Sequence, residues 1–150
     1  MVKASSGPFA LPHALEGELA RAYAFWDRLK RHEAEMPFWD DVKISTLPEL
    51  AARLMMIDAS DKPVRFRIAH GLIGADIKQR YGHDLSGEFL DEIDVAAPLQ
   101  FLLSQCSATV EGRAPTYYRD EAKAGGYSRL ALPLWGDGRI GMLLVAYTFA

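Results

Sequence analysis

One histidine stands in the middle of an apolar strand pattern. Between Val64 and Leu72, apolar side chains alternate with polar or small ones, and Phe66, Ile68 and His70 fall on the apolar face. This period of two predicts a strand with one face on a core. An inward imidazole could hydrogen-bond a ligand's carboxylate or carbonyl, or act as a general base, and burial would favour its neutral form. These three residues are therefore candidate ligand contacts; the alternative is a core histidine satisfied by a backbone carbonyl or a tyrosine.

Two tyrosines and an arginine form a second candidate site. Tyr118 belongs to a predicted strand over residues 115–119, and Tyr127 and Arg129 open another over residues 127–135. On neighbouring strands, inward hydroxyls and a guanidinium could bind an anionic group, since arginine supplies a two-pronged donor. The alternative is an edge-strand aromatic patch beside solvated arginines, which is the commoner arrangement.

Other chemistry finds little support in the residues. The acidic pair Asp40–Asp41 and the acidic residues around Asp91 read as solvated caps, because neighbouring carboxylates do not converge on one point. No Ser-His-Asp order, G-x-S-x-G, phosphate-binding loop or His-Glu-x-x-His occurs. The single cysteine, Cys106, excludes an internal disulfide and a cysteine-based zinc site, and its place on an apolar helical stripe suggests a small buried hydrophobe.

Composition indicates an ordinary globular domain. The chain has 150 residues, 49% of them hydrophobic, and a net charge of −3 with scattered basic residues. That balance argues against a nucleic-acid partner. No apolar run is long enough to span a bilayer, and prolines interrupt the N-terminal stretch, so neither a membrane anchor nor a secretory signal is expected. A cytoplasmic protein is the plain interpretation.

The N-terminal part predicts an amphipathic helix. Residues 1–14 are expected to form a flexible leader, and residues 15–36 a helix that Pro37 ends. Leu19, Tyr23, Trp26 and Leu29 share its apolar face. That face must be buried, either against the sheet of its own domain or against the same helix of a second chain. We predict a homodimer through these four residues.

The remaining elements predict a sheet interrupted by helices. Two strands, over residues 54–58 and 64–72, precede a helical middle that includes a helix over residues 97–111. Three strands follow, over residues 115–119, 127–135 and 140–149. This order predicts an α+β fold with a five-stranded antiparallel sheet and helices on one face.

These pieces together resemble a PAS domain, of the kind found as small stand-alone proteins in alphaproteobacteria. The pieces are FWDRL, LPELAARLMMID, RFRIAHGLIG, YGHDLSG with FLDEI, and LALPLWGDG, which cover nearly the whole chain after residue 20. The most specific piece is a spaced motif made by Gly74, Gly82, Asp84, Leu85, Ser86 and Gly87. The chain departs from the family at Ala75, where threonine is common, and at His70.

The resemblance implies a PAS-like domain over residues 37–150 that holds a small molecule between sheet and helices. It also implies dimerisation through the N-terminal helix. Haem is disfavoured, because only His83 is available in the middle segment. Flavin photochemistry is disfavoured, because Cys106 lacks the surrounding residues that such sensors have. The cofactor stays unassigned.

The expected function is a non-catalytic sensory or interaction module. With no output segment recognised in the sequence, the signal is expected to pass through dimerisation or a partner signalling protein. One rival is a small α+β enzyme that uses His70 in a pocket, with a second polar group within hydrogen-bond reach. Another is a structural dimer without a ligand.

Overall fold

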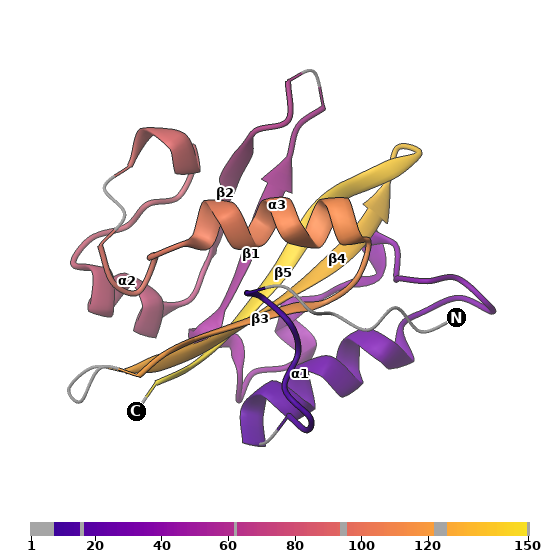
Figure 1. The fold of residues 1–150 in the computed structure, drawn as a ribbon, viewed down its shortest axis with the longest axis horizontal. Helices are drawn as coiled ribbons and strands as arrows, with labels where there is room; N and C mark the ends of the chain where they lie inside the picture. The colour runs from indigo at the N-terminus through magenta and orange to yellow at the C-terminus, as the bar shows by residue number, and fades with distance from the viewer. Residues whose placement is uncertain (1–7, 16, 62, 94–95, 122–125, 150) are drawn as a thin grey trace.

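The computed structural model describes residues 8–149 except 16, 62, 94–95 and 122–125 (Figure 1). The helices and strands are α1 Gly17–Arg28, β1 Leu54–Ala59, β2 Phe66–Ile73, α2 Ala75–Tyr81, α3 Leu102–Gly112, β3 Thr116–Asp120, β4 Tyr127–Gly136 and β5 Arg139–Phe149. Short 3₁₀ turns cover Trp39–Asp41, Ile44–Thr46, Ala51–Arg53 and Leu90–Glu92. Within the described ranges the strands form one antiparallel sheet in the order β2-β1-β5-β4-β3. The predicted α+β class and antiparallel sheet are confirmed.

Strand register divides the sheet residues between two faces. Arg129 lies opposite Tyr147 of β5, and it hydrogen-bonds to α3, which crosses the strands in Figure 1. We call the face that carries Arg129 the inner face. By the same register Ile57 and Ile68 lie on it. Leu130, Leu132 and Leu134 point the other way, to the outer face.

Helix α1 packs against β4 and β5. Its buried residues are Leu19, Ala22, Phe25 and Trp26. The Trp26 indole N–H donates to the backbone carbonyl of Pro133 at 2.8 Å. The three leucines of the outer face are fully buried, as expected for a face that a helix covers. α3 therefore lies on the inner face, and the N-terminal helix α1 covers the outer face of its own sheet, which was one of the two alternatives predicted for its apolar side.

This packing corrects part of the predicted dimer face. Leu19 and Trp26 are buried within the single chain, so they offer no surface to a second copy. Tyr23 and Leu29 are partly buried against the same core. Dimerisation through α1 stays a prediction, and of the four residues only Tyr23 and Leu29 keep exposed surface for it.

The helix α1 ends at Arg28, well before the predicted end at residue 36. Residues 31–35 are all exposed, so no buried apolar side chain supports another turn. His32 also has a left-handed backbone conformation, with φ of 51°. The predicted helix was too long because charged residues continued the pattern without an apolar face.

The segment from Pro8 to Leu15, which we call the strap, lies along the edge of β3. The carbonyl of Phe9 accepts a hydrogen bond from the Tyr117 N–H at 3.0 Å. Leu11 and Leu15 pack against the core. Residues 1–7 of the predicted leader lie outside the described residues, but the strap is an ordered edge contact and leads directly into α1 (Figure 1).

Gly82 of the spaced motif caps the helix of the middle segment. Helix α2 ends at Gly82, which has φ of 115°, and the Gly82 N–H donates to the carbonyl of Lys78. Glycine adopts this left-handed conformation without steric cost. Beyond it, Gly87 and Glu88 exchange backbone hydrogen bonds with Ile68, and so cover the free edge of β2.

The segment before β1 contains the 3₁₀ turns Ile44–Thr46 and Ala51–Arg53, and the Thr46 hydroxyl donates to the Lys43 carbonyl. The predicted helix over residues 97–111 is shorter than expected. Helix α3 begins at Leu102 instead of residue 97, because the carbonyls of Pro98 and Gln100 point to a side chain of β4. In the part of the chain that the structure describes, no helix is long and apolar enough to cross a membrane.

Candidate functional site

Arg129 of β4 is a completely buried cation. Its Nε–H donates to Oε1 of Gln105 in α3 at 2.6 Å. Its Nη1 and Nη2 groups donate to the backbone carbonyls of Pro98 at 3.0 Å and Gln100 at 2.7 Å. Three of the five guanidinium N–H groups are used in this way. The side chain therefore ties β4 to α3 and to the loop before α3 through neutral acceptors alone.

Three tyrosine rings surround this guanidinium. The Arg129 Cζ atom lies 4.9 Å from the ring centroid of Tyr118, 5.9 Å from that of Tyr127 and 5.8 Å from that of Tyr147. Cations are attracted to aromatic faces at this range. Burial raises the pKa of all three hydroxyls, and the positive charge of Arg129 opposes that rise. The tyrosines are therefore neutral at physiological pH, and their charge does not balance that of Arg129.

Arg129 has no ion-pair partner in the cluster. Among the residues that the structure describes, no carboxylate forms an ion pair with it, whereas the partly exposed Arg53, Arg65 and Arg67 are each paired with an acid. The Asp120 carboxylate acts on Tyr118 and Tyr127 and raises their pKa values. A buried charge normally has a partner of opposite sign, because desolvation is costly. Neutral carbonyls and aromatic faces compensate only part of that cost. An anion would be stabilised here.

One hydroxyl in the cluster has no proper partner. The Tyr127 oxygen is buried and makes no hydrogen bond of normal geometry with any described residue. The Tyr127 hydroxyl does lie close enough to that of Tyr118 to lower the pKa of Tyr118 by a hydrogen-bond interaction. By contrast, the Tyr147 hydroxyl donates to the Pro98 carbonyl at 2.8 Å. A buried unpaired hydroxyl is uncommon and suggests a place where a ligand atom can bind.

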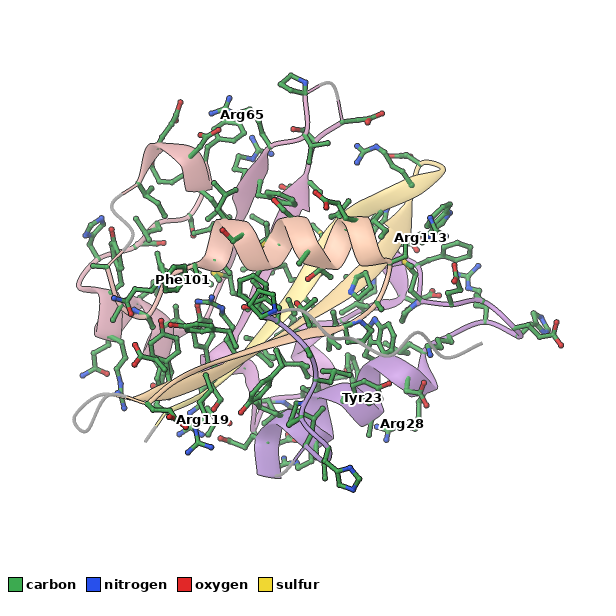
Figure 2. All side chains as sticks on the ribbon, viewed as in Figure 1. Tyr23, Arg28, Arg65, Phe101, Arg113 and Arg119 are labelled. Atoms are coloured by element: carbon green, nitrogen blue, oxygen red, sulfur yellow. The ribbon has the colours of Figure 1, made fainter. Side chains whose placement is uncertain are left out.

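The cluster is covered by a short loop and by aromatic rings. The loop over residues 98–101 supplies the two carbonyls, and it ends at Phe101, which is 60% exposed and lies beside the first turn of α3 (Figure 2). The Phe101 ring centroid lies 5.7 Å from that of Tyr118. The ring centroid of Phe9 in the strap lies 6.3 Å from that of Tyr118. Among the described residues, these rings and the loop are next to the cluster.

Of the sequence-predicted site residues, the structure brings Tyr118, Tyr127 and Arg129 together. Phe66 and Ile68 are buried on the same inner face, but they belong to β2, three strands away from β4. At about 4.8 Å per strand they lie roughly 14 Å from the Arg129 backbone. They pack in the core and do not line the cluster.

His70 lies in β2, but its side chain is outside the described residues. Its role as a ligand contact or general base stays a prediction.

The sequence reasoning missed two members of the cluster, Gln105 and Tyr147. Gln105 is a buried amide on the same helical stripe as Leu102 and Cys106. A single polar residue on an apolar stripe was the signal that could have revealed it. Tyr147 lies between Ala146 and Thr148 in β5, and its position opposite Arg129 depends on a register that the sequence does not state.

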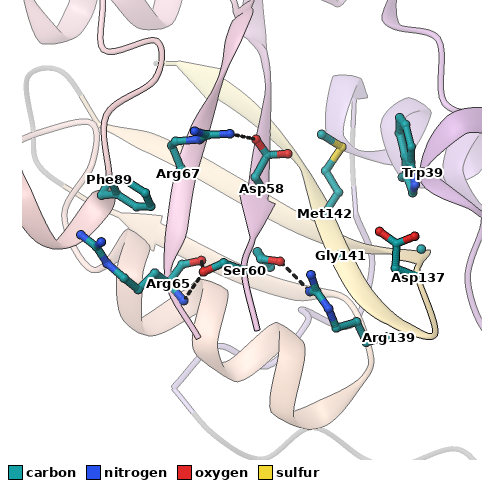
Figure 3. A pocket seen from close by; sticks show the side chains of 12 residues that line it. Trp39, Asp58, Ser60, Arg65, Arg67, Phe89, Asp137, Arg139, Gly141 and Met142 are labelled. Carbon is teal, nitrogen blue, oxygen red and sulfur yellow. Dashed lines mark hydrogen bonds and ion pairs between the residues drawn. The ribbon is translucent and has the colours of Figure 1, made fainter. Parts of the chain in front are cut away.

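A second candidate is an open groove on the outer face, with a volume of about 400 Å³. Figure 3 shows Trp39 and Asp137 at one end, Arg65 and Phe89 at the other, and the Arg67–Asp58 pair between them.

The cations of this groove are already engaged. Arg65 binds Asp91 through two hydrogen bonds and also reaches Glu92, which raises the pKa of Arg65 further. Arg139 donates to the carbonyl of Ala59. Since acids stand among these bases, the groove has less unbalanced charge than the Arg129 cluster. We regard the cluster as the stronger site.

Cys106 has no catalytic surroundings. It is fully buried on α3, and burial raises the pKa of its thiol to about 12. A neutral buried thiol is a poor nucleophile. Among the described residues, no group of three His, Cys, Asp or Glu side chains could hold a metal ion.

Comparisons with models of known protein families, with curated proteins and with solved structures found no match to this chain. The resemblance to PAS domains thus rests on the sequence motifs and the order of elements.

Proposed function

We propose that this protein is a non-catalytic sensory module of the PAS type that binds a small organic anion at the Arg129 cluster. One observation carries the proposal: a fully buried guanidinium has three neutral acceptors, three tyrosine rings and no carboxylate partner among the described residues. A carboxylate or phosphate would supply the missing negative charge.

The cluster offers specific contacts to such a ligand. Arg129 has N–H groups beyond the three that bind Gln105, Pro98 and Gln100, and its guanidinium also interacts with the Tyr147 hydroxyl. The Tyr127 hydroxyl is a further donor. The Pro98 and Gln100 carbonyls hold the guanidinium in the unliganded protein. An anion is a stronger acceptor than a peptide carbonyl, so its binding would displace this loop and create the space it needs.

Sensing fits the cluster better than catalysis. Burial raises the pKa values of its tyrosines, so these hydroxyls do not exchange protons near pH 7. The PAS assignment is supported by the order of two strands, a helical middle and three strands, and by the motif that ends at Gly87. We propose that the bound state is read by a partner protein.

The test is calorimetric titration of the full chain with benzoate, acetate and inorganic phosphate. We expect at least one of these probes to bind the wild type, and binding to fall at least tenfold in Arg129→Lys, which keeps the charge but loses the planar fork. Tyr127→Phe should weaken binding several-fold without loss of folding. Circular dichroism confirms that each variant is folded. Failure of all three probes to bind, or equal binding by Arg129→Lys, would overturn the proposal.

A further inference from the structure

Tyr118 contacts two further aromatic rings beside the Arg129 cluster. The ring centroid of Phe101 lies 5.7 Å from that of Tyr118, and the centroid of Phe9 lies 6.3 Å from it. Tyr118 is also the ring nearest to the guanidinium, at 4.9 Å. A ligand that enters beside these rings must therefore move Tyr118 or Phe101.

The backbone of Phe101 has an unfavourable conformation. Phe101 has φ of 59°, a left-handed conformation that a bulky residue rarely adopts, and its ring is mostly exposed. The loop before it is held by hydrogen bonds to Arg129, the group that the ligand would engage. Loss of those bonds would free Phe101 to relax.

The strap connects the contact at Tyr118 to α1, which lies on the outer face of the sheet. Phe9 is fixed by its ring contact with Tyr118 and by the bond from the Tyr117 N–H to its carbonyl. Leu11 and Leu15 follow, and the chain then enters α1 on the outer face. A change at Tyr118 is therefore passed along a short continuous segment to α1.

We infer that Phe9, Tyr118 and Phe101 form the gate of the Arg129 site, and that the strap is its latch. The opening of the gate by a ligand rests on the proposed function, whereas the closed arrangement of the three rings does not depend on it. In the closed state the three rings shield Arg129 from solvent. When an anion binds Arg129, the loop and Tyr118 move, Phe9 loses its ring contact, and the strap detaches from the edge of β3.

The gate is tested without a ligand by chemical modification of the full chain. Phenylglyoxal reacts with accessible guanidinium groups, and peptide mapping by mass spectrometry follows Arg129 and the exposed Arg119 separately. We expect Arg129 to react at least tenfold faster in Phe9→Ala and in Phe101→Gly than in the wild type, while Arg119 reacts at one rate in all. Leu103→Ala is the matched control, since it removes an exposed apolar side chain of α3 outside the gate.

Global unfolding is monitored by the reactivity of buried Cys106 in the same samples. Modification of Arg129 at the wild-type rate in both gate variants would overturn the proposed gate. Faster modification would also overturn it if it occurred only in variants where Cys106 becomes reactive, because those variants would be unfolded.

The latch is tested by amide exchange at Tyr117, whose N–H the strap protects. Saturating benzoate should speed this exchange at least fivefold in the wild type and leave it unchanged in Arg129→Lys. Benzoate that binds while Tyr117 stays protected overturns the latch. Should none of the anions bind, the proposed function fails and the latch fails with it, whereas the modification experiment still decides the gate.

Discussion

At the scale of single residues, the two buried tyrosines beside Arg129 differ in one respect. The Tyr147 hydroxyl donates to Pro98, and the Tyr127 hydroxyl has no partner of normal geometry. Leaving a buried polar group unpaired costs free energy, whereas a formed hydrogen bond contributes modestly to stability. The free energy of unfolding should therefore respond in opposite ways when each hydroxyl is removed.

We predict that Tyr127→Phe leaves the free energy of unfolding unchanged or raises it by up to about 1 kcal/mol, and that Tyr147→Phe lowers it by about 1 kcal/mol. Urea denaturation of the unliganded protein measures both. The substitutions are chemically identical, so each serves as the control for the other. Equal losses in the two variants would show that Tyr127 has a partner in solution.

A second prediction at this scale concerns pH. Burial holds the pKa of Cys106 at about 12 in the folded chain, against 9.0 for an ordinary thiol. Because the folded value is the higher one, the protonated thiol stabilises the fold fully below pH 9. That stabilisation is lost as pH rises from 9 towards 12. We expect the urea midpoint to fall over this range in the wild type and to fall less in Cys106→Ala.

At pH 8 the folded protein should also be inert to a thiol-specific reagent until urea unfolds it. Rapid reaction of the folded chain at that pH would contradict the buried position of Cys106.

Sequence patterns found three of the five side chains that form the cluster. Tyr118, Tyr127 and Arg129 could be grouped because the predicted strands were neighbours along the chain, and such strands often pair. Gln105 and Tyr147 could not, because their approach to Arg129 depends on helix placement and on the register of β5. The same limit explains the error with Phe66 and Ile68: alternation identifies an inner face, but it does not tell how many strands separate two residues.

At the scale of elements, the end of β4 packs closely against the 3₁₀ turn Trp39–Asp41. A Cβ atom on Gly136 would lie 2.2 Å from Cδ1 of Trp39, well inside van der Waals contact. The indole can therefore rest on this strand only because residue 136 is glycine. Gly112 offers a comparison, since a Cβ there would meet no atom within 4 Å.

We predict that Gly136→Ala lowers the free energy of unfolding by about 1–3 kcal/mol, through the overpacking against Trp39. Gly112→Ala should change it by less than about 0.5 kcal/mol. In a Trp39→Ala background the cost of Gly136→Ala should largely disappear, which a double-mutant cycle measures. An undiminished cost in that background would place the strain elsewhere.

At the scale of the whole molecule, the sheet is stable because both of its faces are covered. α3 and the loop before it cover the inner face near β3 and β4, and α1 covers the outer face over β4 and β5. The sequence of β5 is apolar on both sides, which is typical of a strand covered on both faces. Which helix covered which face was not readable, since an amphipathic helix shows only that its apolar side must be buried.

This arrangement changes what a charge on α1 should do. An aspartate at Trp26 would leave a carboxylate among buried leucines and remove the bond to Pro133, so we predict a loss of at least about 3 kcal/mol in the free energy of unfolding. Arg28→Asp places the same residue at an exposed position of the same helix and should cost less than about 1 kcal/mol. Urea denaturation with circular dichroism measures the loss, and light scattering measures the oligomeric state. If Trp26→Asp stayed fully folded and only halved the molecular mass, α1 would be a dimer contact rather than a cover of its own sheet.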